Sequence, residues 1–257
     1  MKKIEIKDLD KTYYCFLGYE SILYPYKGKL LKYFRDKEIE DHIESVFNRT
    51  HNLDWYCEMR GKTIDEKTLK NKEIKVSMLP YMKCLEKEIE IYDMCYINGV
   101  FKGYTMEHSH YKNLKSCNKI RDKIEILKMI KRKVEYINSC GIFIGDFNER
   151  NFLTNYAKSD IELCDLDNFR IFKYDFDTKN NSTRLFERKC NKKEYIDSYS
   201  FNVFTICFLS NINQGDFNIR DYDLPRILNT KENRDIRESM IYLDNSYQKK
   251  YLIDNLR

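Results

Sequence analysis

Acidic and amide side chains occur in the second half of the chain at spacings that could support chemistry. Asp146 and Asn151 lie five residues apart, between a helical pattern that ends at a glycine and a short apolar run. Asp165 and Asp167 follow soon after, directly behind a stretch that alternates apolar and acidic residues. Mg²⁺ prefers hard oxygen ligands, and one or two carboxylates with substrate phosphates suffice to hold it. We therefore expect two neighbouring strand ends to present these residues to a hard cation and a phosphate.

The composition indicates a globular protein with one large domain or two lobes. The chain has 257 residues, of which 42% are hydrophobic and 14% aromatic, so it can form a packed core. Its 46 basic and 41 acidic residues leave a formal charge of +5 without the basic clusters typical of nucleic-acid-binding proteins. No nucleic acid partner is therefore predicted. Nine cysteines, an odd number without a Cys-x-x-Cys pair, indicate neither a disulfide framework nor a zinc knuckle.

The hydropathy of the chain predicts no membrane association. The opening residues MKKIEIKDLDK lack the long apolar core of a signal peptide. No apolar run approaches the roughly 20 residues that span a bilayer. We therefore expect a cytoplasmic protein, and the sequence carries no signal for its oligomeric state. The most basic run, at residues 184–193, is either a solvated loop or a contact for an acidic partner.

Strand patterns dominate the first 105 or so residues. Short apolar runs between residues 13 and 34 are separated by Lys27-Gly28, where a hairpin turn fits. Two further runs flank Asn98-Gly99, the strongest short-range hairpin signal in the chain. The sequence therefore predicts two hairpins in the first part of the protein.

Helical spacing of apolar residues predicts four helices, at 36–50, about 66–79, 118–138 and 197–210. The last of these is apolar nearly all round, which is typical of a buried helix. The residues between the first two helices carry no clear pattern. The predicted apolar face of the long third helix, which should end at Gly141, consists of Ile120, Ile124, Leu127, Ile130, Val134 and Ile137.

The order of the two acidic motifs resembles that of the protein-kinase fold. The kinase catalytic loop has the pattern H-R-D-L-x-x-x-N, and the metal-binding strand end has the pattern D-F-G. The segment IGDFNERN (144–151) and the triplet DLD (165–167) match them in order, with Ile144 and Gly145 in place of the His and Arg. The Gly145-Asp146 pair is closer to the H-G-D form of atypical and small-molecule kinases.

Three further segments extend the resemblance over residues 13–210. KLLKYF (29–34) resembles the third strand, V-A-I-K, and puts Lys32 at the position that contacts phosphate. DSYSFNVF (197–204) resembles the start of the buried central helix, commonly D-x-x-S-F-G. FKGYTMEHS (101–109) resembles the strand that leads into the hinge.

The resemblance implies ATP and Mg²⁺ as cofactors and assigns roles to five residues. Asp146 would orient or deprotonate the acceptor hydroxyl. Asp165 would chelate the metal, and Asn151 would supply a second oxygen. Asp167, which replaces the glycine of D-F-G, would be a further metal ligand or a loop or cap residue. Lys32 would pair with phosphate oxygens as a compact point charge.

Other nucleotide contacts follow from the same resemblance. Gly18 keeps one glycine of the phosphate loop, without the two later ones, and Glu107 would lie in the hinge. A helix glutamate should pair with Lys32, and Glu73 is the preferred candidate. The competing candidates are Glu40 and Glu44.

The fold class implied is α+β, in the form of a single bilobal kinase-like domain. Residues 1–106 would form a nucleotide-binding lobe with an antiparallel sheet and a helix, and residues 107–257 a mainly helical catalytic lobe. The segment between Asn168 and Ile196 would be the activation segment, with Ser182 and Thr183 as candidate phosphorylation sites.

Three functions are compatible with these residues. The first is an atypical bacterial or phage-like protein kinase that phosphorylates Ser, Thr or Tyr hydroxyls of proteins, favoured by the long segment before residue 197. The second is a small-molecule phosphotransferase resembling the aminoglycoside and choline kinases, favoured by Gly145-Asp146. The third is a pseudokinase that acts as a binding module, favoured by the missing glycines.

Overall fold

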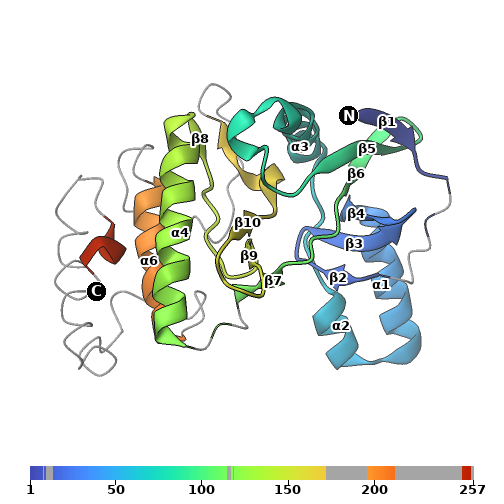
Figure 1. Ribbon diagram of the computed structural model, residues 1–257. Coiled ribbons are helices and arrows are strands. Elements are labelled where there is room, and N and C mark those ends of the chain that lie inside the picture. The colour runs from blue at the N-terminus through green and yellow to red at the C-terminus, as the bar shows by residue number, and fades with distance from the viewer. Residues whose placement is uncertain are drawn as a thin grey trace. The chain divides into compact units, whose positions relative to one another are not determined.

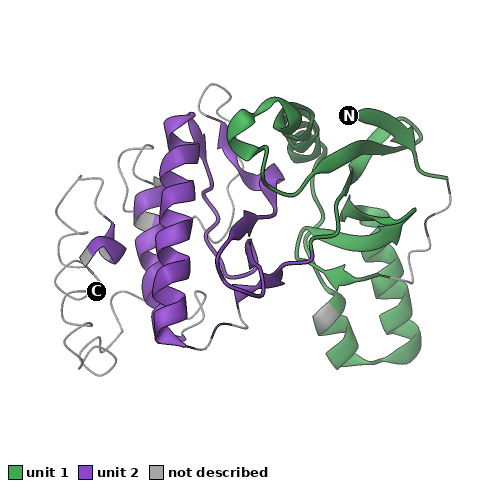
Figure 2. Cartoon of the chain, viewed as in Figure 1, with its two compact units in different colours: residues 1–109 green, residues 110–257 purple. Residues whose placement is uncertain are grey.

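The protein is a mixed α+β chain that divides into two compact units, residues 1–109 and 110–257 (Figure 2). The predicted boundary at 106/107 falls three residues earlier. The first unit is rich in antiparallel strands and the second carries two long helices, as the patterns predicted. The computed structural model describes residues 1–7, 9, 14–114, 117, 119–171, 196–211 and 251–255.

A six-stranded sheet forms the centre of unit 1, in the order β1-β5-β6-β4-β3-β2. All neighbours are antiparallel except β1, which pairs in parallel with β5. No strand was predicted at β1, although KIEIK (3–7) alternates polar and apolar residues, which is a strand signal. The strands are β1 (Lys2–Glu5), β2 (Phe16–Leu17), β3 (Ser21–Tyr26), β4 (Lys29–Phe34), β5 (Ile91–Ile97) and β6 (Val100–Met106).

Both predicted hairpins are confirmed. Lys27 and Gly28 join β3 to β4 with φ values of 50° and 77°, and Asn98 and Gly99 join β5 to β6 with 51° and 74°. Two consecutive residues with positive φ are typical of the type I′ turn, whose twist matches that of the flanking strands. Asn and Gly tolerate this conformation well, so the local sequence is enough to place the second hairpin.

Three helices complete unit 1, and each begins at a side chain that caps it. Asp36, Asn52 and Asp65 accept hydrogen bonds from backbone N–H groups three residues on, at 3.1, 3.0 and 2.9 Å. The two predicted helices are confirmed, and the unassigned stretch between them contains a third, too short to show periodicity. The elements are α1 (Lys37–Thr50), α2 (Leu53–Met59), α3 (Glu66–Met78) and the 3-10 turns η1 (Leu79–Tyr81) and η2 (Lys83–Leu85).

Strand β4 shows how the helices cover both faces of this sheet (Figure 1). Leu31 and Tyr33 point to one face and belong to the same apolar cluster as Ile39 and Ile43 of α1. The alternate residues of a strand point the other way. There Phe34 lies 5.1 Å from the Nζ atom of Lys72 in α3, measured to its ring centre. The sheet therefore lies between α1 on one side and α3 on the other.

Unit 2 is built on two long helices that pack against each other, α4 (Ile120–Ser139) and α6 (Ile196–Ser210). Both predicted helices are confirmed, and Gly141 follows α4 with a φ of 77°. The predicted apolar face was wrong at its start, because Ile120 is 54% exposed. The side chains of α4 that are buried are Lys123, Ile126, Leu127, Ile130, Val134 and Ile137.

Short strands lie on either side of α4 in the sequence, and the loops between the later ones carry the acidic motifs. Strand β9 pairs with β10 in a hairpin and with β7 on its other edge, and β8 pairs with β11. The chain end that is described packs on α4 and α6. These elements are β7 (Lys112–Asn113), β8 (Ile142–Phe143), β9 (Phe152–Thr154), β10 (Ile161–Leu163), η4 (Leu166–Asn168), β11 (Arg170–Ile171) and η7 (Leu252–Asn255).

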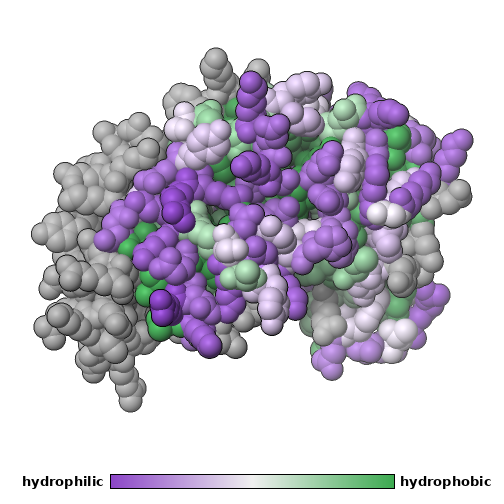
Figure 3. All heavy atoms as spheres, viewed as in Figure 1, coloured by the Kyte–Doolittle hydropathy of each residue, from purple (hydrophilic) through white to green (hydrophobic). Residues whose placement is uncertain are grey.

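Hydrophilic residues predominate among the described residues on the face drawn in Figure 3. None of the described helices is both long and apolar enough to cross a membrane. The predicted activation-segment residues Ser182 and Thr183 and the basic run at 184–193 lie outside the described residues.

Candidate active site

The loop that carries Asp146 begins with a sharp turn directly after β8. Gly145 has a φ of +72°, and the N–H of Asp146 donates to the carbonyl of Ile144 at 2.8 Å. A side chain at this φ is strained by its own Cβ atom, so glycine suits the position. The turn places Asp146 immediately outside the strand end, where the sequence predicted it.

Asn151 and Asp146, which the sequence was expected to bring to one site, contact each other directly. The Asn151 Nδ2 atom donates to the Asp146 carboxylate oxygen Oδ2 and to its backbone carbonyl, both at 3.0 Å. Within the described residues, the Oδ1 atom of Asn151 accepts no hydrogen bond. The amide therefore holds the Asp146 carboxylate with its nitrogen and keeps an oxygen for another ligand.

Asp165 is brought to the same place by the β9–β10 hairpin. The N–H of Cys164 donates to the carbonyl of Asn151 at 3.1 Å, so the residues that flank the hairpin are adjacent. Asp165 follows at once, with a φ of +62°, and its Oδ2 accepts a hydrogen bond from Asn168 Nδ2 at 2.5 Å. The structure thus brings Asp146, Asn151 and the start of the DLD triplet together.

Asp167, the other predicted metal ligand, differs from Asp165 in its surroundings. It lies inside η4 and is 0% exposed, whereas Asp165 is half-buried. The described residues contain no group of three or more His, Cys, Asp or Glu side chains that could hold a metal by themselves. A cation with two ligands, Asp165 and Asn151, would take its others from water and phosphate, which is how Mg²⁺ is usually bound.

Asp197, at the start of α6, holds this loop in place. It is 0% exposed, and its carboxylate accepts hydrogen bonds from the N–H groups of Ile144 at 2.7 Å and Gly145 at 2.8 Å. With its amide nitrogen turned inward, Asn138 donates to the same carboxylate at 2.8 Å. Burial raises the pKa of Asp197 to about 6, although these three donors favour the charged form. From the sequence Asp197 was expected on the buried helix, without a role at the site.

Aromatic packing fixes the residue after Asp146. The ring of Phe147, which is 2% exposed, lies 5.8 Å from that of Phe152 and 6.0 Å from that of Phe201, measured between ring centres. Rings in tilted and edge-on contact stabilise one another beyond their buried area. The loop is therefore anchored to β9 and to α6.

Lys32 lies in unit 1, on β4, and is 5% exposed. Its Nζ atom is 5.8 Å from the ring centres of both Phe34 and Tyr104. A cation over aromatic rings is stabilised by their electrons even when it is removed from water. The side chain therefore lies on the face of the sheet that α3 covers.

The predicted ion pair between Glu73 and Lys32 is not formed. Glu73 accepts a hydrogen bond from the Tyr96 hydroxyl at 2.7 Å, and the Lys3 Nζ atom is 4.0 Å away. Glu73 thus points toward β1 and β5 at the far edge of the sheet. The competing Glu40 also contacts another residue, since Arg35 donates to it at 2.8 Å. Helical periodicity does not decide which side of α3 meets β4.

Lys72 occupies the side of α3 that meets β4. It is 1% exposed, and its Nζ atom lies 3.5 Å from a carboxylate oxygen of Glu20. Where the resemblance expects an acidic residue on the helix, the structure therefore has a cation, and a carboxylate from the turn before β3 lies beside it.

That turn is short and closed by Gly18. The N–H of Gly18 donates to the carbonyl of Ser21 at 2.8 Å, so Tyr19 and Glu20 form its corner. A Cβ atom at Gly18 would lie 2.8 Å from the same carbonyl oxygen. The glycine is required by this close approach.

Glu107, the predicted hinge residue, follows β6 and is exposed. Its backbone N–H donates to the carbonyl of Glu90 at 2.9 Å, and is therefore already used within the protein. The carbonyl group of Glu107 is the part of the residue that a base could contact.

In comparisons with known proteins, no protein-family model and no curated sequence matched the chain.

Proposed function

We propose that the chain is an ATP- and Mg²⁺-dependent phosphotransferase with a bilobal kinase-like fold, and that it phosphorylates hydroxyl groups of proteins. The observation that carries the proposal is the pair formed by Asp146 and Asn151, 3.0 Å apart, beside Asp165. Phosphoryl transfer depends mainly on positioning and charge neutralisation. These three residues supply a base, an amide oxygen and a carboxylate in one loop cluster.

Each residue has a role that fits its contacts. Asp146 would orient the acceptor hydroxyl and accept its proton, while the Asn151 amide holds its carboxylate in one orientation. Asp165 and the Oδ1 atom of Asn151 would hold Mg²⁺. When bound, the metal would neutralise charge on the phosphate oxygens. Lys32 would supply a second positive charge to the phosphates.

The order of elements supports the proposal. A mainly antiparallel sheet with helices on both faces precedes a long helix, an acidic loop, a hairpin and a buried helix. The buried acidic residue at the start of the last helix, Asp197, binds the backbone of the acidic loop. This sequence of parts matches the resemblance from the catalytic loop to the central helix.

Intact-mass spectrometry after incubation with Mg²⁺ and ATP tests the proposal. The unmutated protein should gain phosphate, and both Asp146→Asn and Asp165→Asn should not. Asp165→Asn removes the charge with little change in structure, because Asn tolerates a positive φ and its side-chain oxygen can still accept the hydrogen bond from Asn168. The matched control is Asp254→Asn, which removes an exposed carboxylate that pairs with Lys131 at 2.6 Å. If the two site variants gain as much phosphate as the control, the assignment of the site is wrong.

A second function, a kinase-shaped binding module, is favoured by the turn at residues 18–21. Its corner carries Glu20 where the resemblance expects glycine, and a side chain there restricts how closely phosphate can approach the backbone. Thermal stability with and without Mg²⁺-ATP separates the two functions. If the protein binds Mg²⁺-ATP but gains no phosphate, its acceptor is a separate protein or small molecule. If it does not bind Mg²⁺-ATP, the function as a binding module is supported.

A further inference from the structure

All four carbonyl groups of the turn at residues 18–21 are hydrogen-bonded within unit 1. The Gly18 carbonyl accepts from Arg35 Nε at 2.9 Å, and the Glu20 carbonyl accepts from the Arg35 backbone N–H at 2.9 Å. The Tyr19 carbonyl accepts from the Lys62 N–H at 2.8 Å. The Ser21 carbonyl closes the turn on Gly18. Such a turn has its backbone oxygens fixed and turned inward.

Arg35 makes two of these four contacts. It is 1% exposed, and its Nη1 donates to Glu40 in the first turn of α1 at 2.8 Å. Its Nη2 atom is buried without a hydrogen-bond partner within the described residues. Leaving a buried donor unpaired costs about 1–3 kcal/mol.

The segment that follows α2 holds Arg35 from its other side. The N–H of Ile64 donates to the Arg35 carbonyl at 3.0 Å. A Cβ atom at Gly61 would lie 2.3 Å from Arg35 Nε, so the backbone there packs directly on the guanidinium group. The segment 36–65, which contains α1 and α2, therefore encloses Arg35 and reaches the turn through it.

We propose that Arg35 and the segment 36–65 form a brace that positions the turn at 18–21 for nucleotide phosphates. The inference rests on the proposed function. With the four carbonyls held, the N–H groups of Tyr19 and Glu20 donate no hydrogen bond within the described residues and are the groups left to meet an anion. The turn lacks the later glycines, and a rigid turn lowers the entropy that binding must overcome. The brace would thus hold the backbone of the turn in one conformation, where a glycine-rich loop would adapt to the phosphates.

Two substitutions disturb the brace in different ways. Arg35→Met removes the guanidinium group, and Gly61→Ala leaves it intact but forces it to move. Arg35→Lys is a third, milder variant that keeps the charge and loses the planar fork, so a loss of folding in Arg35→Met leaves the inference testable.

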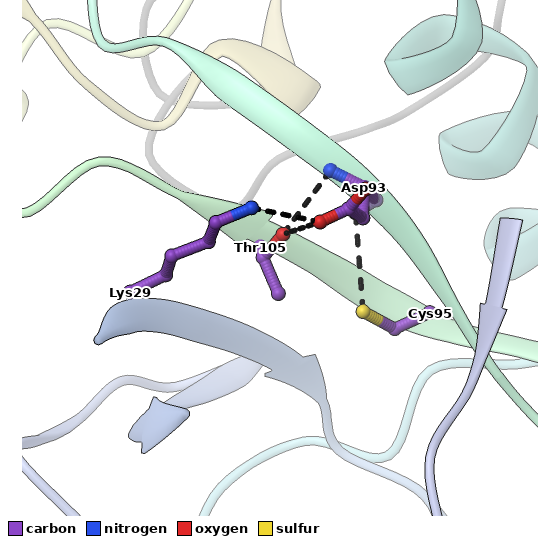
Figure 4. Close-up of polar contacts among 4 residues, drawn as sticks. All are labelled: Lys29, Asp93, Cys95 and Thr105. Atoms are coloured by element: carbon purple, nitrogen blue, oxygen red, sulfur yellow. Dashed lines mark hydrogen bonds and ion pairs between the residues drawn. The ribbon is translucent and has the colours of Figure 1, made fainter. Parts of the chain in front are cut away.

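The control residue is Lys29, at the start of β4, the strand that ends directly before Arg35. Lys29 donates to Asp93 at 2.9 Å, and Thr105 donates to the same carboxylate at 3.1 Å (Figure 4). Lys29→Met therefore removes an ion pair similar in length to that between Arg35 and Glu40, without changing any contact of the turn at 18–21.

Amide hydrogen exchange tests the brace without reference to activity. We expect the amides of Gly18, Arg35 and Lys62 to exchange at least about tenfold faster in Arg35→Met and Gly61→Ala, because these amides bond to or within the turn. Their exchange should be unchanged in Lys29→Met. Equal exchange in all three variants would overturn the brace.

The KM for ATP tests what the brace is for. In Arg35→Met and Gly61→Ala it should rise about tenfold while kcat changes less, since the turn would bind phosphate in both ground and transition states. Faster exchange with an unchanged KM would overturn the role in nucleotide binding. Faster exchange in a protein that does not bind Mg²⁺-ATP at all would leave the brace standing and overturn the proposed function.

Discussion

The carboxylate of Asp197 accepts a hydrogen bond from the backbone N–H of Gly145 at 2.8 Å, although the two residues lie 52 positions apart. The N–H of Ile144 donates to the other oxygen at 2.7 Å. Since Asp197 is 0% exposed, water cannot replace these bonds if the carboxylate is removed. The first turn of α6 therefore determines where the loop with Asp146 lies.

Removing this carboxylate should destabilise unit 2 and impair the site together. Asp197→Ala leaves two buried N–H groups without an acceptor, and we expect a loss of about 3 kcal/mol in the free energy of unfolding. Asp197→Asn keeps one acceptor oxygen and should lose less. Urea unfolding measures both, and Asp254→Asn serves as an exposed control. Equal stability of Asp197→Ala and the control would contradict the role of Asp197.

The stability of the protein should depend on pH through the same residue. Burial raises the pKa of Asp197 from 3.8 to about 6, so the folded state binds its proton more tightly than the unfolded state. Its contribution to stability is therefore complete below pH 3.8 and decreases as the pH rises to about 6. At 1.36 kcal/mol per pKa unit the decrease is about 3 kcal/mol. We therefore expect the free energy of unfolding of the unmutated protein, relative to that of Asp197→Asn, to fall by about 3 kcal/mol between pH 3.8 and about pH 6. If the free energies of the two proteins change with pH in parallel, Asp197 is not the residue responsible.

A methyl group at Gly145 should cost both stability and activity. Gly145 has a φ of +72°, and we expect Gly145→Ala to lose about 1–2 kcal/mol from backbone strain. Because the turn positions Asp146, phosphate transfer should fall at least about tenfold. Gly28→Ala is the matched control, since Gly28 has a φ of +77° in an open hairpin turn with nothing within 4 Å of an added Cβ. Gly28→Ala should lose a similar amount of stability but keep the phosphate-transfer activity. If both variants lose activity, the cause is unfolding and not the position of Asp146.

Lys123 should stabilise the C-terminal end of α6. Its Nζ atom donates to the Phe208 carbonyl at 2.5 Å and to Asn211 Oδ1 at 2.6 Å, and its side chain is buried on α4. Cations at helix C-termini satisfy carbonyls that lack helical partners. We expect Lys123→Met to lose about 2–3 kcal/mol in chemical denaturation. The surface variant Lys128→Met, on the same helix, should lose less than about 1 kcal/mol.

Removal of Mg²⁺ should abolish stabilisation by ATP. A ligand at a hundred times its Kd raises the free energy of unfolding by about 2.7 kcal/mol, and we expect such an effect from ATP with Mg²⁺ but not with a chelator. Asp165→Asn should behave like the chelated protein, because it removes the carboxylate and keeps the backbone conformation. A full ATP effect in Asp165→Asn would exclude Asp165 as the metal ligand.

Features that depend on neighbours in sequence were determined by the sequence itself. Asn98-Gly99 specified its hairpin, because few residues adopt two positive φ values in a row. Asp36 and Asp65 marked the starts of α1 and α3, since a cap acts within one turn. The contact between Asp146 and Asn151 also lies within one short loop, so it joins residues that are close in sequence.

Features that depend on which surfaces meet were decided by the tertiary structure. The direction of Glu73 toward Tyr96 follows from how α3 sits on the sheet, which its periodicity does not contain. Asp197 accepts a hydrogen bond from the Gly145 N–H, and Arg35 is enclosed by α1 and Gly61. Both contacts join parts of the chain that are distant in sequence. Local conformation is governed by short-range sterics and capping. The burial of side chains and the hydrogen bonds between distant residues, by contrast, form only when separate elements pack together.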